Sequence, residues 1–573
     1  RRWRGISRFQ RRLVLLLLAL ALFVFWFALP RVAVMERAAA GQDLQMVDPP
    51  GFEAGPAKPE ERADPTSASP PPELPKPPRP PALPDAPGVA GPAAGVAASR
   101  RSPLPAGSLG RLSETSPSRR QLAVLEAMQH SWKAYELYAW GKDEVHPLSK
   151  SSAVWMGAGL TLIDSLDTLM IMGMSQQVAK AREWVATQLN FDVDKPHTNV
   201  FETTIRLLGG LLSAYHLSND SIYLDRALQL GERLLPAFSS PSGLPYSDIN
   251  LHTGQASNPV WTVESSTSEV SSVQLELREL SRLTGRPEFA DAADRISRVL
   301  HSADKKDGLV PIYVNSVTGR LHNGGTVSLG ARGDSYYEYL IKQFVQAGKS
   351  RSFEYLRDDW LAAMDGVAKH LVRESQPHRF KFVGELLGGT TFSPKMDHLV
   401  CFLPGALAYG FLHGMPREHL RLAEQLMRTC YITYTTTATG LAPEITHFNT
   451  DAASVADTYV KPLDRHNIQR PETVESLFYM WRVTGDRKYQ DWGWAIFQAF
   501  EKYTKVQPAG YVSISDVTNA RNPGKRTKCE SFWFAETLKY FFLLFSEDND
   551  LLPLDKWLFN TEAHPLPIWP RQP

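Results

Sequence analysis

The sequence lacks the features that mark several large classes of protein. Three cysteines in 573 residues exclude a scaffold built on disulfides, so the fold must depend on a hydrophobic core. Its 62 basic and 61 acidic residues give a net charge of +1, and we therefore expect no nucleic-acid partner. No H-E-x-x-H, C-x-x-C or EF-hand metal motif is present, and neither is a G-x-S-x-G nucleophile motif. By exclusion, any catalysis would depend on carboxylates.

The first 30 residues have the pattern of a membrane anchor. Six arginines within residues 1–12 precede an uncharged apolar run at 13–30, which as a helix of about 27 Å is just long enough to cross a bilayer. Arginines on the N-terminal flank place that end in the cytosol. We therefore predict a cytoplasmic tail (1–12), a transmembrane signal anchor (13–30) and a lumenal remainder. The alternative is a signal peptide cleaved near the alanines at 38–40.

Residues 31–118 form a proline-rich segment. Between residues 41 and 120 there are 19 prolines and one aromatic residue, Phe52. This composition favours extended polyproline II structure and cannot form a core, so we predict a disordered lumenal stem. A ligand for a proline-recognition domain is the alternative. Helical apolar spacing begins near residue 119, and we predict that 119–573 form a single domain.

A short turn recurs between the helices predicted after residue 119. Its clearest copies are LSNDSIYLDRA at Leu217, LTGRPEFADAA at Leu283 and VTGDRKYQDWG at Val483. Each has an Asn or Gly that suits a left-handed helix C-cap. Recurring helical hairpins predict a mainly α fold, arranged as an array or a closed ring of helix pairs. Strand-like pieces, such as YITYTTTATG at Tyr431, are expected to be hairpins inserted between the helices.

Three stretches with carboxylates are candidates for chemistry, and each also has a purely structural explanation. Glu202 and Arg206 lie one helical turn apart, which fits a site or an ion pair on a solvated face. Asp334 is followed by three tyrosines, as in a sugar site, or it caps a helix. Glu472 and Glu475 lie in the first turn of a predicted helix. There they could hold a catalytic water or a cation, or they could complement the helix dipole.

A histidine and the cysteines complete the set of candidates. His398 directly precedes an apolar run, where a histidine is more often a hydrogen-bonded core residue than a ligand. Cys401 and Cys430 have 28 residues between them in a compartment that we expect to be oxidising, so we pair them. Cys529 is expected to remain free.

Seven long segments stand out in the predicted domain. They are TLIDSLDTLMIMG, FETTIRLLGGLLSAYHLS, SLGARGDSYYEYLIKQ, KMDHLVCFLPG, RPETVESLFY, ESFWFAETLKYFFLLFS and FNTEAHPLPIW. Together and in this order they resemble the class I α-1,2-mannosidases, glycoside hydrolase family 47, and the resemblance covers essentially residues 120–573. It implies an (α/α)7 barrel with inserted β-hairpins. It also implies a calcium-dependent (Ca2+) hydrolase that removes terminal mannose with inversion of the anomeric centre.

The resemblance also implies roles for individual residues. Glu202 matches the general acid, Glu472 the general base and Asp334 a third catalytic carboxylate, and the division of acid catalysis between Glu202 and Asp334 stays open. Thr561 matches the residue that gives oxygen ligands to calcium. The positions expected to line the sugar or hold calcium-bound waters are Arg206, Glu269, Arg332, His398, Glu444, Arg470, Glu475, Phe532, Glu536 and Glu562. The pair Cys401 and Cys430 matches the family's disulfide.

The resemblance finally implies a biological setting. The anchor and stem suit the endoplasmic-reticulum member of the family, a single-pass type II membrane protein that trims high-mannose N-glycans in glycoprotein maturation and quality control. Arg332 matches an arginine of that member, which implies that Man9GlcNAc2 loses chiefly one mannose to give a single Man8 isomer. Golgi residence, oligomeric state, protein partners and occupancy of the Asn219 sequon stay open. A catalytically silent, mannose-binding lectin of the same fold is the alternative.

Overall fold

The computed structural model describes residues 116–259, 262 and 264–571, which all lie in one compact unit. The predicted tail and anchor lie outside the described residues, as does the predicted stem except for its last three residues. Within the described part of the chain, no helix is both long and apolar enough to span a membrane.

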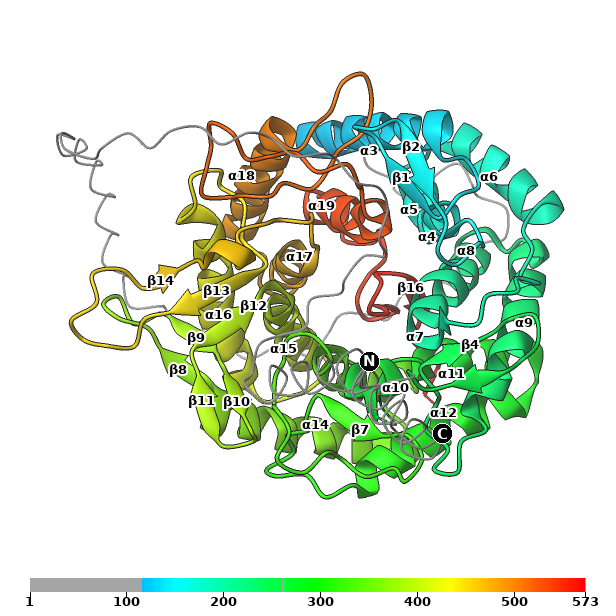
Figure 1. The fold of residues 1–573 in the computed structure, drawn as a ribbon, viewed down its shortest axis with the longest axis horizontal. Coiled ribbons are helices and arrows are strands. Elements are labelled where there is room, and N and C mark those ends of the chain that lie inside the picture. The colour runs from blue at the N-terminus through cyan, green and yellow to red at the C-terminus, as the bar shows by residue number, and fades with distance from the viewer. Residues whose placement is uncertain (1–115, 260–261, 263, 572–573) are drawn as a thin grey trace, which may run out of the picture. The chain divides into compact units, whose positions relative to one another are not determined.

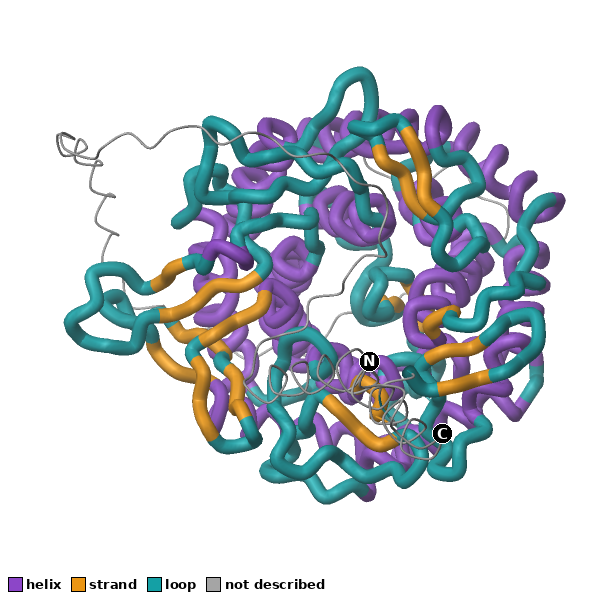
Figure 2. The backbone as a smooth tube through the Cα atoms, in the orientation of Figure 1, coloured by secondary structure: helices purple, strands orange, loops and turns teal. Residues whose placement is uncertain are grey.

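The described residues form a ring of helical hairpins, in which an inner helix packs against an outer one (Figures 1 and 2). The inner helices are α5 (Leu166–Ile171), α8 (Gly209–Ser218), α11 (Gln274–Thr284), α13 (Asp334–Gln346), α15 (Leu403–Leu412), α17 (Glu472–Thr484) and α19 (Leu538–Leu544). Their outer partners are, in the same order, α6 (Ser175–Thr187), α9 (Ser221–Leu234), α12 (Pro287–Ser302), α14 (Glu354–Gly366), α16 (Arg417–Thr435), α18 (Lys488–Tyr503) and α3 (Arg119–Tyr138). Each inner helix contacts the next and α19 contacts α5, so six hairpins and the pair of α19 with α3, from the two ends of the described chain, close the ring.

The closed ring confirms the mainly α fold and explains the recurrent turn. The three copies join inner helices to outer ones, and α8, α11 and α17 end at Asn219, Gly285 and Gly485 with φ of 56°, 70° and 70°. A left-handed residue ends the helix without strain when it is glycine or asparagine. These connections are short, and they all lie at the same end of the barrel because the inner helices run in one direction.

The connections from outer to inner helices are longer and lie at the opposite end, which we call the rim. They hold the short helices α4 (Leu160–Asp164), α7 (Val200–Glu202) and α10 (Thr267–Ser271) and most of the small sheets. These strands are β1 (Glu144–His146), β2 (Ser151–Ala153), β3 (Thr198–Asn199), β4 (Asp248–Ile249), β5 (Ala256–Ser257), β6 (Glu264–Ser266), β7 (Tyr313–Asn315), β8 (Val372–Glu374), β9 (Lys381–Val383), β10 (Glu385–Leu387), β11 (Thr391–Ser393), β12 (Lys395–Asp397), β13 (Ile445–Phe448) and β14 (Thr458–Tyr459).

One hairpin lies inside the ring. Strands β15 (Trp557–Phe559) and β16 (Pro565–Pro567) pair in an antiparallel register, with Leu558 opposite Leu566. β15 contacts α13 and β16 contacts α8, and Figure 1 shows β16 within the ring of helices. The hairpin follows inner helix α19, so it enters the barrel from the end of the short turns. Its turn, which contains Thr561, points into the barrel.

The inner helices are buried between this hairpin and the outer helices. Every residue of α13 after Asp334 is buried. Burial of charged groups requires partners, and within α13 Lys342 donates to Glu338. The barrel interior therefore combines apolar packing with paired charges.

The disulfide prediction is confirmed and one local prediction is wrong. Cys401 and Cys430 form a disulfide, and Cys529 is a buried free thiol. The segment at Tyr431, expected to be a β-hairpin, instead continues helix α16 to Thr435. Residues such as Met427 and Cys430 bury one face of α16 at helical spacing, and this packing outweighs the low helix propensity of the threonines.

Candidate active site

Predicted carboxylates of the site lie at or just before the N-terminal ends of four inner helices. Asp334 is the first residue of α13 and Glu472 the first residue of α17. Glu202 ends α7, just before a π-helical turn (Thr203–Leu208) that leads into α8. Glu536 lies in another π-helical turn (Trp533–Thr537) before α19. Since the inner helices all begin at the rim, residues far apart in sequence meet there.

Arg206 is the centre of one cluster of acids. Its Nε donates to Glu202 Oε2 at 2.6 Å, and its Nη1 donates to Glu562 and lies 3.6 Å from Asp164 Oδ2. Burial alone would lower the pKa of the guanidinium, but the carboxylates of Glu202, Glu562 and Asp164 raise it well above its usual value. The ion pair that the spacing of Glu202 and Arg206 predicted is therefore present, but not on a solvated face, because the Arg206 side chain is only 13% exposed.

Glu472 is the centre of a second cluster. His398 Nδ1 lies 2.7 Å from Glu472 Oε2, and Arg470 Nη1 lies 3.9 Å from its other oxygen. Arg470 Nε in turn donates to Glu444 Oε2 at 2.6 Å. Burial opposes ionisation, yet the His398 hydrogen bond and the Arg470 charge hold the pKa of Glu472 below its usual value. His398 is thus a buried, hydrogen-bonded histidine that also contacts a predicted site residue.

Phe532 and Glu536 connect the two clusters. The centroid of the Phe532 ring lies 5.8 Å from the guanidinium carbon of Arg206 and 6.0 Å from that of Arg470. Burial, followed by the charges of Glu562 and Glu472, raises the pKa of Glu536 well above its usual value. The structure therefore brings the two clusters to one region of the barrel.

Two acids in this region have pKa values near neutrality. Burial and the charges of Glu338 and Glu472 raise the pKa of Asp334 to about 7. Burial and the charge of Glu202 raise the pKa of Glu269 to about 7 as well, although Asn199 Nδ2 donates to Glu269 Oε2 at 3.3 Å. Both carboxyls therefore hold a proton over part of the neutral pH range. The helix cap before Asp334 is Gly333, so Asp334 is not the N-cap.

Arg332 lies in the connection that leads to α13. Its side chain is exposed, and its guanidinium carbon is 5.5 Å from the centroid of the Tyr313 ring. Its backbone has a positive φ of 74°, and its carbonyl accepts from the Ser268 N–H at 2.9 Å. Its charge also acts on Glu269. An exposed cation therefore lies beside one of the acids with a pKa near neutrality.

Thr561 directly precedes Glu562, and the charges of Glu562 and Glu475 both act on the buried Glu536. The Thr561 N–H donates to Tyr339 Oη at 3.3 Å in the turn of the central hairpin. Burial raises the pKa of Glu475, Glu536 and Glu562 well above the usual value, and in each case a neighbouring carboxylate adds to the effect. Such crowding of acidic oxygens suits Ca2+, which prefers oxygen ligands. No group of three or more His, Cys, Asp or Glu in the described residues is arranged as a metal cluster by itself.

Several contacting residues were not singled out by the sequence. Tyr434 Oη lies 2.7 Å from His398 Nε2 and Thr473 Oγ1 lies 3.2 Å from it. Asn199 Oδ1 accepts from the Glu202 N–H at 2.9 Å. Asn199 does have a local signal, because an Asn three residues before a predicted first-turn acid suits a helix N-cap. Tyr434 has none, since it lies in the segment that was expected to be a strand.

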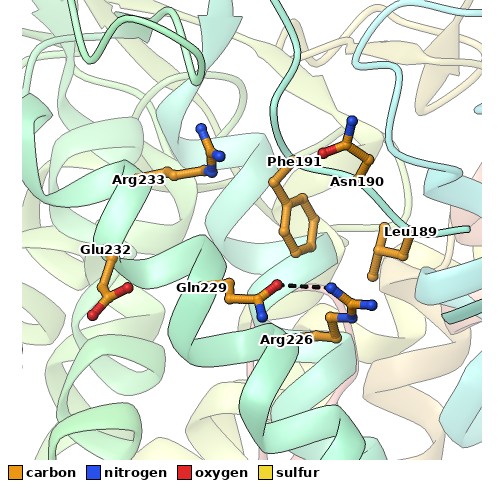
Figure 3. A pocket seen from close by; sticks show the side chains of 7 residues that line it. All are labelled: Leu189, Asn190, Phe191, Arg226, Gln229, Glu232 and Arg233. Atoms are coloured by element: carbon orange, nitrogen blue, oxygen red, sulfur yellow. Dashed lines mark hydrogen bonds between the residues drawn. The ribbon is translucent and has the colours of Figure 1, made fainter. Parts of the chain in front are cut away.

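A separate cavity of about 350 Å3 lies away from this region (Figure 3). It opens between the segment that follows α6 and helix α9, where Arg226 Nη1 donates to Gln229 Oε1 at 2.8 Å. None of the predicted site residues lines it. The rim, not this cavity, therefore contains the candidate site.

Comparisons with known proteins identify the family of the chain. The model of glycosyl hydrolase family 47 matches residues 127–568. The chain is 55% identical over 455 residues to the endoplasmic reticulum mannosyl-oligosaccharide 1,2-alpha-mannosidase of Rattus norvegicus, covering 79% of this chain and 69% of the relative. The corresponding Homo sapiens protein is 54% identical over 452 residues, which cover 78% of this chain and 64% of the relative. A solved alpha-1,2-mannosidase from Trichoderma reesei has a TM-score of 0.73 and 32% identity, over 79% of this chain and all of that one.

Proposed function

The chain belongs to glycosyl hydrolase family 47, and on this premise we propose that it is an α-1,2-mannosidase that trims terminal mannose from high-mannose N-glycans with inversion. Inversion needs a base that activates a water on one face of the sugar and an acid that protonates the leaving oxygen on the other. The observation that supports this proposal is that the pKa values of two acids at the inner-helix N-termini are shifted in opposite directions. The pKa of Glu472 is lowered, which favours its carboxylate, whereas the pKa of Asp334 is raised to about 7, so that it holds a proton over part of the neutral pH range.

Glu472 is the proposed base. A base must be unprotonated at working pH, and the contacts from His398 and Arg470 favour its carboxylate form. His398 is fixed from its other side by Tyr434 Oη at 2.7 Å, so the ring orients one oxygen of Glu472. The other oxygen is then available to accept a proton from water.

The proposed proton donor lies in the pair Glu202 and Asp334. Glu202 is the acid that the family resemblance implies, and its carboxylate is bound to Arg206. Asp334 has a pKa of about 7, so its carboxyl holds a proton over part of the neutral pH range. We therefore propose that Asp334 supplies the proton for departure of the leaving sugar, with Glu202 and Arg206 fixing the sugar beside it.

We also propose that Ca2+ binds at the turn of the central hairpin. Thr561 would supply hydroxyl and carbonyl oxygens, and Glu475, Glu536 and Glu562 would hold the waters around the ion. When bound, the cation would grip vicinal sugar hydroxyls and favour a distorted ring. The crowded acids support this assignment, because a cation among them would offset their mutual repulsion.

The setting that we propose is the endoplasmic reticulum, in glycoprotein maturation and quality control. Support comes from the names of the relatives in Rattus norvegicus and Homo sapiens. Attachment by a single type II anchor rests on the apolar run at 13–30. Trimming of Man9GlcNAc2 to one Man8 isomer rests on Arg332, whose exposed guanidinium at the rim would reject other branches of the glycan.

Incubation with Man9GlcNAc2 tests the function. We expect loss of one mannose, released as the β-anomer, and loss of activity when a chelator removes calcium. Mass spectrometry follows the products and proton NMR gives the anomer before it equilibrates. Restoration by Ca2+ but not by Mg2+ is the control for the metal, because Mg2+ demands a smaller octahedral shell. Tight glycan binding without release of mannose would instead indicate a lectin.

A further inference from the structure

A glycan bound at the site has to leave the barrel across the rim. The opposite end holds the short turns, and the hairpin β15–β16 enters the barrel from that end. The polypeptide that carries the glycan is therefore presented to the long connections of the rim. Their exposed side chains are the ones that could contact it.

One of these connections exposes a group of apolar side chains. Residues 449–464, here called the rim loop, follow β13 and include β14. Val455, Tyr459 and Leu463 in this loop are 96%, 45% and 75% exposed, and the first and last are the two most exposed large apolar side chains of the described residues. Single exposed apolar residues are ordinary, but these three lie within nine residues of one loop, and we call them the apolar patch.

The rim loop is held in place by a buried anchor. Asp457 is only 7% exposed. One of its oxygens accepts from Ser375 Oγ at 2.6 Å and from the His378 N–H at 3.0 Å, and the other lies 2.6 Å from His378 Nδ1. These bonds tie the loop to the turn between β8 and β9. Val455 thus points to solvent from a fixed loop and does not fold back onto the barrel.

The rim loop is continuous with the sugar site. The Glu444 N–H, at the start of β13, donates to the carbonyl of Asp464 at 3.2 Å, at the end of the loop. The carbonyl of Glu444 accepts from the His398 N–H at 2.8 Å, and the Glu444 side chain binds Arg470. The end of the loop is thus bonded to Glu444 of the candidate site, and its start follows β13, which begins next to Glu444, so this strand joins the rim loop to the site.

We propose that Val455, Tyr459 and Leu463 bind an apolar segment of the polypeptide that carries the glycan being trimmed. The inference rests on the proposed function, since it takes the glycan to be attached to a protein. A polypeptide that exposes apolar side chains would bury them against the patch, whereas a folded glycoprotein with a polar surface would gain nothing from it. The rim loop would then make trimming faster on unfolded glycoproteins.

The test compares a double variant with a control on two substrates. V455S/L463S removes the two most exposed side chains without touching the site, and L122S removes a side chain that is 45% exposed at the start of α3, at the opposite end of the barrel. The full chain is assayed with free Man9GlcNAc2 and with a reduced, alkylated glycoprotein bearing the same glycan. For V455S/L463S we expect kcat/KM to fall about tenfold, equivalent to about 1.4 kcal/mol, on the glycoprotein and to change less than twofold on the free glycan. L122S should change neither.

Other results would overturn the proposal. An equal loss on both substrates would mean that the rim loop acts on the sugar site, and no loss on either would mean that the patch binds no polypeptide. Loss of binding to phosphatidylcholine vesicles, or of self-association, without a change on the glycoprotein would assign the patch to a membrane or to a second copy. If the unaltered chain releases no mannose from the free glycan, the proposed function fails. Affinity of labelled unfolded glycoprotein for the two variants then still decides the role of the rim loop.

Discussion

The raised pKa of Asp334 predicts a specific loss of activity above neutral pH. A general acid works only while protonated, so a group with a pKa of about 7 loses activity as the pH rises through 7. The protonated fraction falls from about 0.9 at pH 6 to about 0.09 at pH 8, so kcat/KM should fall about tenfold over this interval. The loss of activity at low pH should follow protonation of Glu472, whose lowered pKa keeps it ionised across the neutral range. We call the loss of activity above pH 7 the alkaline limb of the pH profile.

Two variants identify the residue whose titration causes the alkaline limb. Asp334→Asn should remove the limb and lower kcat/KM on an α-1,2-linked mannobiose by about 100-fold or more, in the range of a lost general acid. The same variant should keep most of its activity on α-mannosyl fluoride, because fluoride leaves without protonation. Glu269→Gln is the matched control, since Glu269 also has a pKa of about 7 but is not the proposed donor. It should retain the limb.

The assay is a pH series on both substrates, read by released mannose. The reasoning would be refuted if Asp334→Asn lost as much activity on the fluoride as on the mannobiose, or if its profile still fell above pH 7. Sparing of the fluoride by Glu202→Gln, but not by Asp334→Asn, would assign the donor to Glu202 instead.

Three further predictions concern the base, the specificity and the disulfide. Glu472→Gln should lower turnover by at least about 1,000-fold on both substrates while isothermal titration still detects glycan binding, because the water loses its base; a loss of less than about tenfold would show that the base is another residue. Arg332→Leu should extend trimming of Man9GlcNAc2 past Man8 in a mass-spectrometric time course, and an unchanged product series would remove the arginine from the specificity argument. Cys401→Ser with Cys430→Ser should lower the free energy of unfolding by about 3.6 kcal/mol in denaturant melts, the chain-entropy value for a loop of this length, and an unchanged midpoint would refute that value.

The hairpins were predictable from sequence because their signals are local. Gly285 and Gly485 predict the ends of their helices from a few neighbouring residues, and in the structure both are C-caps with left-handed backbone geometry. The closure of the ring was not visible in this way, since contact between α19 and α5 depends on packing between distant segments. The strand prediction for the segment at Tyr431 was wrong for the same reason. Its local composition favours a strand, but the buried face of α16 decides the structure.

In the candidate site, too, local contacts could be predicted from the sequence and contacts between distant segments could not. The pair Glu202 and Arg206 could be read from a spacing of four residues, but the contact of Arg206 with Glu562 joins positions 356 residues apart. Only that second contact shows that the pair is buried in a site and not placed on a solvated face. A resemblance to known sequences supplied what spacing could not, namely which distant segments share the site. It did not supply the protonation states, which depend on burial and on neighbouring charges.

Two buried aspartates near the site show that a sequence motif can indicate the need for charged partners without identifying them. Asp164 and Asp167 lie in the apolar run TLIDSLDTL, where an ionised acid without a partner would be costly, so the sequence implies partners for both. Those partners come from the far end of the chain. His564 lies 3.1 Å from Asp164 and 2.8 Å from Asp167, and Lys539 lies 2.9 Å from Asp167, all with fully buried side chains. Burial opposes protonation of His564, yet Asp167 raises its pKa, which favours the charge that balances the group. Because Asp164 also lies 3.6 Å from Arg206, the contacts that fix the central hairpin extend to the acids of the site. The two aspartates therefore hold the barrel's first and last segments together at the point where the chemistry requires fixed geometry.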